Sequence, residues 1–204
     1  MDVYEDGKRV RTEYSSPHLF NGRVDFYEDG KRVRTEYSSP HLFHGQVDVY
    51  EDGKHVHTEF SSSHAEHGSI DFYEEGKRVR TEYSSPHLFH GEVDFYEDGK
   101  RVRTEFKPPH PNHGLVAFIE DEKLVRTEVH GTVHFYEDGK RVRTEFKPPH
   151  PNHGLVRTEV HGTVHFFENG KHVCSKFPCG EVRFFKNGRI VRKTFGRKRG
   201  RDEC

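Results

Sequence analysis

Apolar and polar residues alternate along most of the chain, in short runs broken by Asp-Gly or Asn-Gly steps. The segment 24–37, VDFYEDGKRVRTEY, shows the pattern clearly. Alternation is typical of a β-strand with two different faces, and Asp-Gly between two such runs is the strongest short-range signal of a hairpin. The segment therefore predicts a β-hairpin with a two-residue turn at Asp29 and Gly30.

A two-residue turn fixes which residues of this hairpin face each other. Counted outward from the turn, the predicted pairs are Glu28 with Lys31, Tyr27 with Arg32, Phe26 with Val33, Asp25 with Arg34, and Val24 with Thr35. One predicted face is apolar and consists of Val24, Phe26, Val33, Thr35 and Tyr37. The other face is charged; opposite charges meet on it, and the Tyr27 ring can stack against Arg32.

The hairpin recurs along the sequence. Turn glycines follow every 23 residues at Gly7, Gly30, Gly53, Gly76 and Gly99, and the later units shorten to 17–18 residues. The first unit is truncated, and the unit near 115–125 is degenerate. A third unit, near 154–162, lacks a stretch equivalent to residues 117–125. Connectors that contain proline, such as SSPHLFHG at 38–45 and KPPHPNHG at 107–114, separate the hairpins.

A single hairpin buries too little surface to be stable alone, so neighbouring hairpins must stack. The expected fold is all-β: an elongated, open, single-layer array of about nine tandem antiparallel hairpins. We expect the array to occupy residues 1–182, with the last hairpin and a basic tail over residues 183–204.

Composition and charge agree with such an array. Charged residues make up 33% of the chain and the mean hydropathy is -1.00, so one large apolar core is not expected. The net charge of -1 hides a basic C-terminal segment and an acidic remainder. No apolar run reaches the roughly 18 residues of a membrane span, and the three cysteines suit a reducing compartment. The expected location is the cytoplasm.

The unit HGxVxFYEDGKxVxTEY, with variants FFENGKHV at 166–173 and FFKNGRIV at 184–191, resembles MORN and MORN-variant repeats. The shared features are the length of the unit, a His-Gly step, an aromatic residue before an Asp/Asn-Gly turn, and a second aromatic residue seven positions after the turn glycine. The resemblance extends over most of the chain. It implies a single-layer sheet of hairpins that acts in scaffolding, protein contacts or association with acidic phospholipids.

The charged face is the first choice for partner contact, because near-identical units present the same groups at a regular interval. A protein or an acidic phospholipid surface is the expected partner. The candidate residues are Asp25, Tyr27, Arg32, Arg34, Glu36, Tyr96, Arg101, Arg103, Tyr136, Arg141 and Arg143.

Histidines in the connectors offer an alternative, since two imidazoles spaced His-x-x-His in a loop can hold zinc or another transition metal. The candidate ligands are His41, His44, His87, His90, His110, His113, His150 and His153. His172, Cys174 and Cys179 form a weaker candidate zinc site. Structural loop histidines are the competing interpretation.

The basic tail offers a further alternative: contact with nucleic acid or another anionic surface, or a nuclear address. Its candidate residues are Arg192, Lys193, Arg197, Lys198, Arg199 and Arg201. A solvated tail without a partner is the competing interpretation.

Catalysis has no support in the sequence, because the same residue types recur in every unit and a catalytic site needs an asymmetric constellation. We therefore expect a non-enzymatic repeat scaffold or binding module without a cofactor. A fragment of a larger repeat gene without an independent role is a further alternative.

Overall fold

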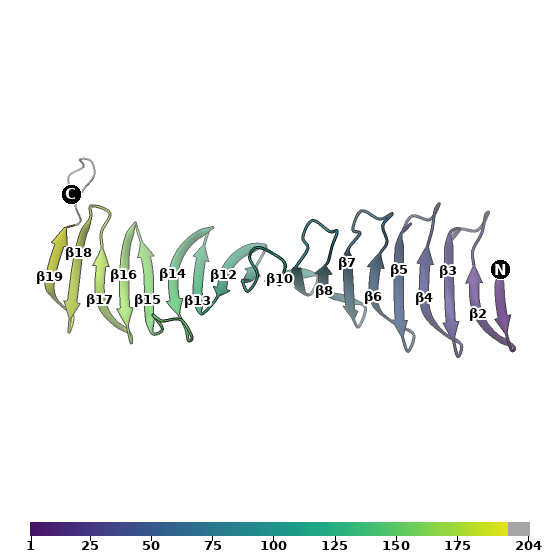
Figure 1. Ribbon diagram of the computed structural model, residues 1–204, viewed down its shortest axis with the longest axis horizontal. Helices are drawn as coiled ribbons and strands as arrows, with labels where there is room; N and C mark the ends of the chain where they lie inside the picture. Colours follow the sequence, from purple (N-terminus) through teal and green to yellow (C-terminus); the bar gives the residue numbers. More distant parts are fainter. Residues whose placement is uncertain (196–204) are drawn as a thin grey trace. The chain divides into compact units, whose positions relative to one another are not determined.

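The computed structural model describes residues 1–195, and within them every regular element is a β-strand. Figure 1 shows the strands side by side in chain order within each part of the chain. Within residues 1–195, neighbouring strands of each part of the chain pair antiparallel, and the sheet is open, as the sequence predicts. By its contacts the chain divides into two units, Met1–His113 and Gly114–Cys204.

The strands of the first unit form a first hairpin, in which the short β1 (Asp2–Glu5) pairs with β2 (Lys8–Glu13), and four further hairpins. The strands of these four hairpins are β3 (Arg23–Glu28), β4 (Lys31–Tyr37), β5 (Gln46–Glu51), β6 (Lys54–Phe60), β7 (Ser69–Glu74), β8 (Lys77–Tyr83), β9 (Glu92–Glu97) and β10 (Lys100–Phe106). Those of the second unit are β11 (Val116–Glu120), β12 (Lys123–Val129), β13 (Thr132–Glu137), β14 (Lys140–Phe146), β15 (Leu155–Val160), β16 (Thr163–Glu168), β17 (Lys171–Lys176), β18 (Glu181–Lys186) and β19 (Arg189–Phe195).

The predicted hairpin turn is confirmed. Asp29 and Gly30 both have positive φ, 47° and 78°, which is the backbone that an Asp-Gly turn of the hairpin type requires. The first two predicted pairs, Glu28 with Lys31 and Tyr27 with Arg32, are also present.

The predicted pairing is wrong beyond Arg32, because a β-bulge at Val33 adds one residue to β4. Phe26 therefore faces Arg34 rather than Val33, and Asp25 faces Thr35 rather than Arg34. A shift of one residue exchanges the faces of everything that follows it. The same bulge recurs in the other hairpins, for example between Arg101 and Arg103.

The bulge creates a polar row through the first unit, buried except at Asp2, which we call the Asp-Thr row. In each hairpin a threonine hydroxyl donates a hydrogen bond of 2.5–2.8 Å to the facing aspartate. Asp25 is 1% exposed and Thr35 is 0% exposed, so the most buried groups of this unit are polar. The row consists of Asp2, Thr12, Asp25, Thr35, Asp48, Thr58, Asp71, Thr81, Asp94 and Thr104.

The opposite face carries a second row, which we call the Phe-Arg row, where arginines lie over phenylalanine rings. Arg80 lies 4.0 Å from the centroid of Phe72, and Arg103 lies 3.9 Å from that of Phe95. In the first unit the row consists of Arg11, Phe26, Arg34, Val49, His57, Phe72, Arg80, Phe95 and Arg103. The apolar stripe that the sequence predicts is therefore replaced by stacked arginine and phenylalanine.

The unit that is shortened near residues 154–162 forms the single strand β15 in place of a hairpin. β15 is connected to β14 by a loop and to β16 by the tight turn at His161 and Gly162. Arg157 faces Thr144 of β14 on one side and Phe166 of β16 on the other. Facing residues point to the same side of a sheet. Phe166 therefore points to the side of Thr144, whereas Phe135 points to the opposite side with Arg143. The Phe-Arg row changes sides at β15, because the missing stretch removes the equivalent of one strand.

Candidate functional site

Six connector loops share one construction. The first histidine of each loop accepts a hydrogen bond at Nδ1 from the backbone N–H two residues later, at 3.0–3.1 Å. In the loop after β4, Tyr37, His41 and Phe43 form a cluster with ring centroids 4.7–5.6 Å apart. Such contacts suit aromatic rings, which prefer tilted or edge-on arrangements.

Consecutive loops of the first unit are joined to one another. The backbone N–H of Ser38 donates to the carbonyl of Gly22 at 2.8 Å, and equivalent bonds run from Ser61, Ser84 and Lys107 to the preceding loops. Gly22 has a φ of +91°, and a Cβ at this position would lie 2.4 Å from the Ser38 carbonyl oxygen. The glycine of the His-Gly or Asn-Gly step therefore allows one loop to lie directly against the next.

This stacking leaves three leucines projecting from the edge of the first unit. Leu19, Leu42 and Leu88 are 88%, 89% and 89% exposed, and the phenylalanine after each is 40–48% exposed. The equivalent residue of the intervening loop is Ala65. We call these three Leu-Phe pairs the leucine tips. Three leucines with almost no contacts in their own chain, repeated at one structural position, form a candidate binding surface.

Sequence reasoning missed the leucine tips. The available signal was a Leu-Phe pair in the middle of an otherwise polar connector, repeated at positions 19, 42 and 88. Alternation identifies strands but carries no information about which loop side chains are exposed.

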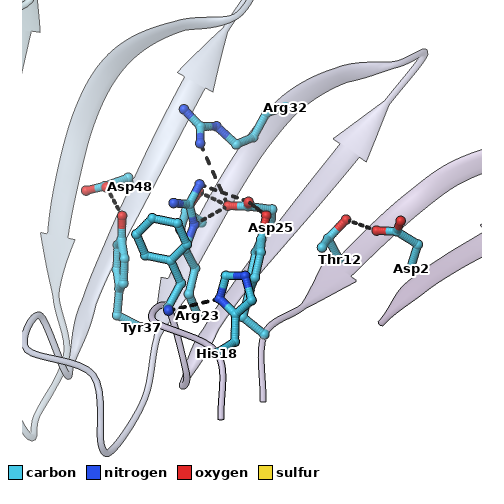
Figure 2. A network of polar contacts seen from close by, with 11 residues as sticks. Asp2, Thr12, His18, Arg23, Asp25, Arg32, Tyr37 and Asp48 are labelled. Carbon is cyan, nitrogen blue, oxygen red and sulfur yellow. Dashed lines mark hydrogen bonds and ion pairs between the residues drawn. The ribbon is translucent and has the colours of Figure 1, made fainter. Parts of the chain in front are cut away.

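The residues proposed for partner contact do not share one face. Asp25 is buried, and Arg23 holds its carboxylate with two hydrogen bonds of 2.9 Å (Figure 2). Arg34 and Glu36 lie on the opposite side and form an ion pair at 2.8 Å. The predicted single charged face is therefore wrong, because the bulge moves Arg34 and Glu36 to the other side of the sheet.

The remaining members of that set also divide between the two faces. On the side of the Asp-Thr row, Arg101 contacts Asp94 at 3.3 Å and Tyr96 lies under Arg78 at 4.2 Å. On the Phe-Arg side, Arg103 and Arg143 each stack on a phenylalanine at 3.9 Å. Tyr136 faces Arg141, and the Tyr136 hydroxyl lies 3.5 Å from that of Thr127.

The expected stacking of Tyr27 against Arg32 is replaced by stacking between hairpins. Arg9 of the preceding hairpin lies 4.1 Å from the Tyr27 centroid, and Arg32 lies 4.1 Å from that of Tyr50 in the next hairpin. Burial raises the pKa of the Tyr50 phenol, and the nearby Asp48 carboxylate raises it further. These side chains connect neighbouring hairpins of the array.

The histidines of each His-x-x-His pair have different environments. The first members, His41, His87, His110 and His150, are half-buried, with Nδ1 occupied by the backbone bond described above. Of the second members, His44, His113 and His153 are exposed and His90 is half-buried. Among residues 1–195, no three His, Cys, Asp or Glu side chains are grouped closely enough to hold a metal ion. The structure thus assigns the first histidine of each pair a structural contact.

In the second candidate metal site, His172 also makes contacts within the protein. Its Nε2 lies 2.8 Å from the Ser175 hydroxyl and 3.1 Å from the Cys174 carbonyl, and its ring stacks on Phe185 at 4.1 Å. Burial raises the pKa of the Cys174 thiol, which disfavours the thiolate that a metal would bind.

The basic candidates lie only partly within the described chain. Arg192 lies 5.7 Å over the Phe184 ring, and Lys193 lies 3.8 Å from Glu181. Arg197, Lys198, Arg199 and Arg201 lie outside the described residues. No helix within residues 1–195 is long and apolar enough to cross a membrane.

The two units differ in charge. Residues 1–113 contain 15 basic and 22 acidic residues, a formal net charge of -7, whereas residues 114–204 contain 18 and 12, a net charge of +6. Neither the models of known protein families nor the curated proteins contain a match to this chain.

Proposed function

We propose that this chain is a non-enzymatic repeat scaffold that binds a protein partner through the leucine tips of its first unit. The observation that carries the proposal is the exposure of Leu19, Leu42 and Leu88, at 88–89%. Transfer of a leucine side chain from water to an apolar environment is worth roughly 1.5–3 kcal/mol. A partner that covers these side chains therefore gains free energy at each tip.

Repetition of the tips raises the overall affinity for a partner that contacts several of them. Once one tip is bound, the others are held near the partner at a high effective concentration. The stacked loops keep the spacing of the tips fixed, because the backbone bond from Ser38 to Gly22 and its equivalents join each loop to its neighbour. Preorganised tips lose little conformational entropy when they bind.

The charge of the first unit favours a protein over an acidic bilayer. A formal net charge of -7 in residues 1–113 opposes approach to anionic lipid headgroups. The resemblance to MORN-type repeats supports a scaffolding role, and the recurrence of the same residue types in every unit supports a role without catalysis.

Photo-crosslinking tests the proposal. Phe43 is replaced by benzoylphenylalanine in the full chain, which is then irradiated in an extract of its own cell. We expect a discrete protein adduct whose yield falls when Leu19→Ser and Leu88→Ser are added. Ala65→Ser is the matched control, because it changes the same loop position where no leucine is present.

Two results would overturn the proposal. One is an adduct whose yield does not depend on the leucines. The other is leucine-dependent flotation with phosphatidylserine vesicles in the absence of any protein adduct, since a bilayer would then be the partner. Far-UV circular dichroism of each variant establishes that the hairpin array is retained.

A further inference from the structure

The outermost strands of the described chain, β1 and β19, each pair on one side only within residues 1–195. β1 pairs with β2, and β19 pairs with β18. Both strands are largely exposed, and they display Tyr4 at 59%, Ile190 at 44% and Val191 at 60%. A free strand edge offers backbone N–H and C=O groups to another strand.

The array itself shows how two such edges can fit together. Within the chain, the second strand of one hairpin pairs with the first strand of the next, as β4 pairs with β5. In that junction Arg34 faces Val49, Thr35 faces Asp48 and Glu36 faces Val47. β19 is a second strand and β1 is a first strand, so β19 of one copy and β1 of another have the polarity that this junction needs.

Alignment on the turn glycines, Gly188 with Gly30 and Gly7 with Gly53, predicts the pairs of such a junction. Arg192 would face Val3, Lys193 would face Asp2, and Thr194 would face Met1. Each second strand of the first unit has threonine at the position where β19 has Lys193. The substitution places a cation opposite the Asp2 carboxylate, in a row where facing groups interact directly.

The turn end of the junction is complementary as well. Inside the array, Lys31 binds Asp52 of the next turn at 2.7 Å, and Arg32 stacks on Tyr50. The equivalent residues at the two edges are Arg189 with Asp6, and Ile190 with Tyr4. The junction would therefore form one ion pair and one apolar contact, both from side chains that are exposed in the single chain.

We propose that copies of this chain associate head to tail, with β19 of one copy paired antiparallel to β1 of the next. The net charges of -7 and +6 on the units that carry these two edges favour this orientation over the pairing of like edges. A heterologous contact leaves a free edge at each end of a pair of copies, so the assembly can extend beyond a dimer. The inference is independent of the leucine tips.

Sedimentation velocity of the full chain over a range of concentrations tests the proposal. We expect the mean mass to rise with concentration and to fall when salt is added, because the contact is partly electrostatic. Asp2→Lys and Lys193→Glu each place like charges at the junction, and each alone should weaken association roughly tenfold or more.

Mixing the two variants gives the sharpest result. The Asp2→Lys chain retains Lys193, the Lys193→Glu chain retains Asp2, and the two altered edges also have opposite charges. The mixture should therefore associate much more strongly than either variant alone. Lys140→Glu makes the same change of net charge away from the β19 edge and should associate as the original chain does.

Either of two outcomes would overturn the inference: a chain that remains monomeric at every concentration, or single variants that associate as strongly as the original. Circular dichroism of both variants shows whether the array has folded. Failure here would leave the leucine-tip proposal standing, because none of these substitutions touches the loops.

Discussion

The hydroxyl of Thr35 donates a 2.6 Å hydrogen bond to the carboxylate of Asp25, and neither residue is more than 1% exposed. Tyr14 and Arg23 also bind this carboxylate, so the buried charge is surrounded by donors. Burial of a charge is tolerated only when it is paired and hydrogen-bonded. The same threonine-aspartate relationship in successive hairpins takes the place of an apolar core.

Loss of one donor should therefore weaken the array locally. Thr35→Val keeps the shape of the side chain and removes the hydroxyl, and we expect a cost of about 1–3 kcal/mol. Hydrogen exchange of the β3 and β4 amides measures this cost, because a repeat array need not unfold in a single step. The control Lys31→Gln removes an ion pair between two exposed side chains and should change exchange little. Equal effects of the two substitutions would contradict the importance of the Asp-Thr row.

Alanine substitutions at two glycines can distinguish the cost of an unfavourable backbone conformation from the cost of a steric clash. Gly22 and Gly30 both have positive φ, but a Cβ would meet the Ser38 carbonyl only at Gly22 and would meet nothing within 4 Å at Gly30. Each alanine substitution should cost about 1 kcal/mol for the backbone. Gly22→Ala should cost roughly 1–3 kcal/mol more, because it forces the stacked loops apart. Thermal melts of the two variants compare the costs, and equal melting temperatures would show that the loops do not press on this position.

The second unit contains a pH-dependent counterpart of the Asp-Thr row. His134 lies at the aspartate position and its Nδ1 is 3.0 Å from the Thr144 hydroxyl. Burial lowers the pKa of His134, and Arg141 and Arg157 lower it further. The unfolded chain therefore takes up a proton at a higher pH than the folded chain does. Stability should fall as the pH drops from about 6.5, the ordinary histidine pKa, toward the depressed folded value.

His134→Asp tests this prediction by restoring the pair of the first unit. The carboxylate would accept the Thr144 hydroxyl and face two arginines, so the fall in stability just below pH 6.5 should become smaller. Denaturant titrations between pH 5 and pH 7.5 measure the difference. An unchanged pH profile would mean that His134 is not the group responsible.

The change of sides at β15 can be tested with cysteine pairs. Arg157 and Phe166 face each other across β15 and β16, whereas Arg157 and His165 point to opposite sides. In a chain whose three native cysteines are serines, Arg157→Cys with Phe166→Cys should form a disulfide under mild oxidation. Arg157→Cys with His165→Cys should not. The reverse result would put His165 rather than Phe166 on the side of Arg157 and Thr144, as in an uninterrupted array.

The sequence by itself determined the hairpins, their repetition and the open all-β arrangement. These depend on local chemistry: Asp29 and Gly30 tolerate the positive φ of a tight turn, and alternation specifies a strand with two faces. The first two pairs beside the turn follow from the same geometry. Close to the turn, chain connectivity alone fixes the register.

Only the tertiary structure decided which residues share a face. The bulge at Val33 lets Asp25 face Thr35 and sends Arg34 to the side of Phe26. Nothing in alternation marks one valine as the extra residue, because the preference arises from hydrogen bonds and stacking between hairpins. The exposure of Leu42 has the same origin: the Tyr37, His41 and Phe43 rings pack together and leave the leucine outside. Such contacts join residues of different strands and loops, so they become visible only when the hairpins stand side by side.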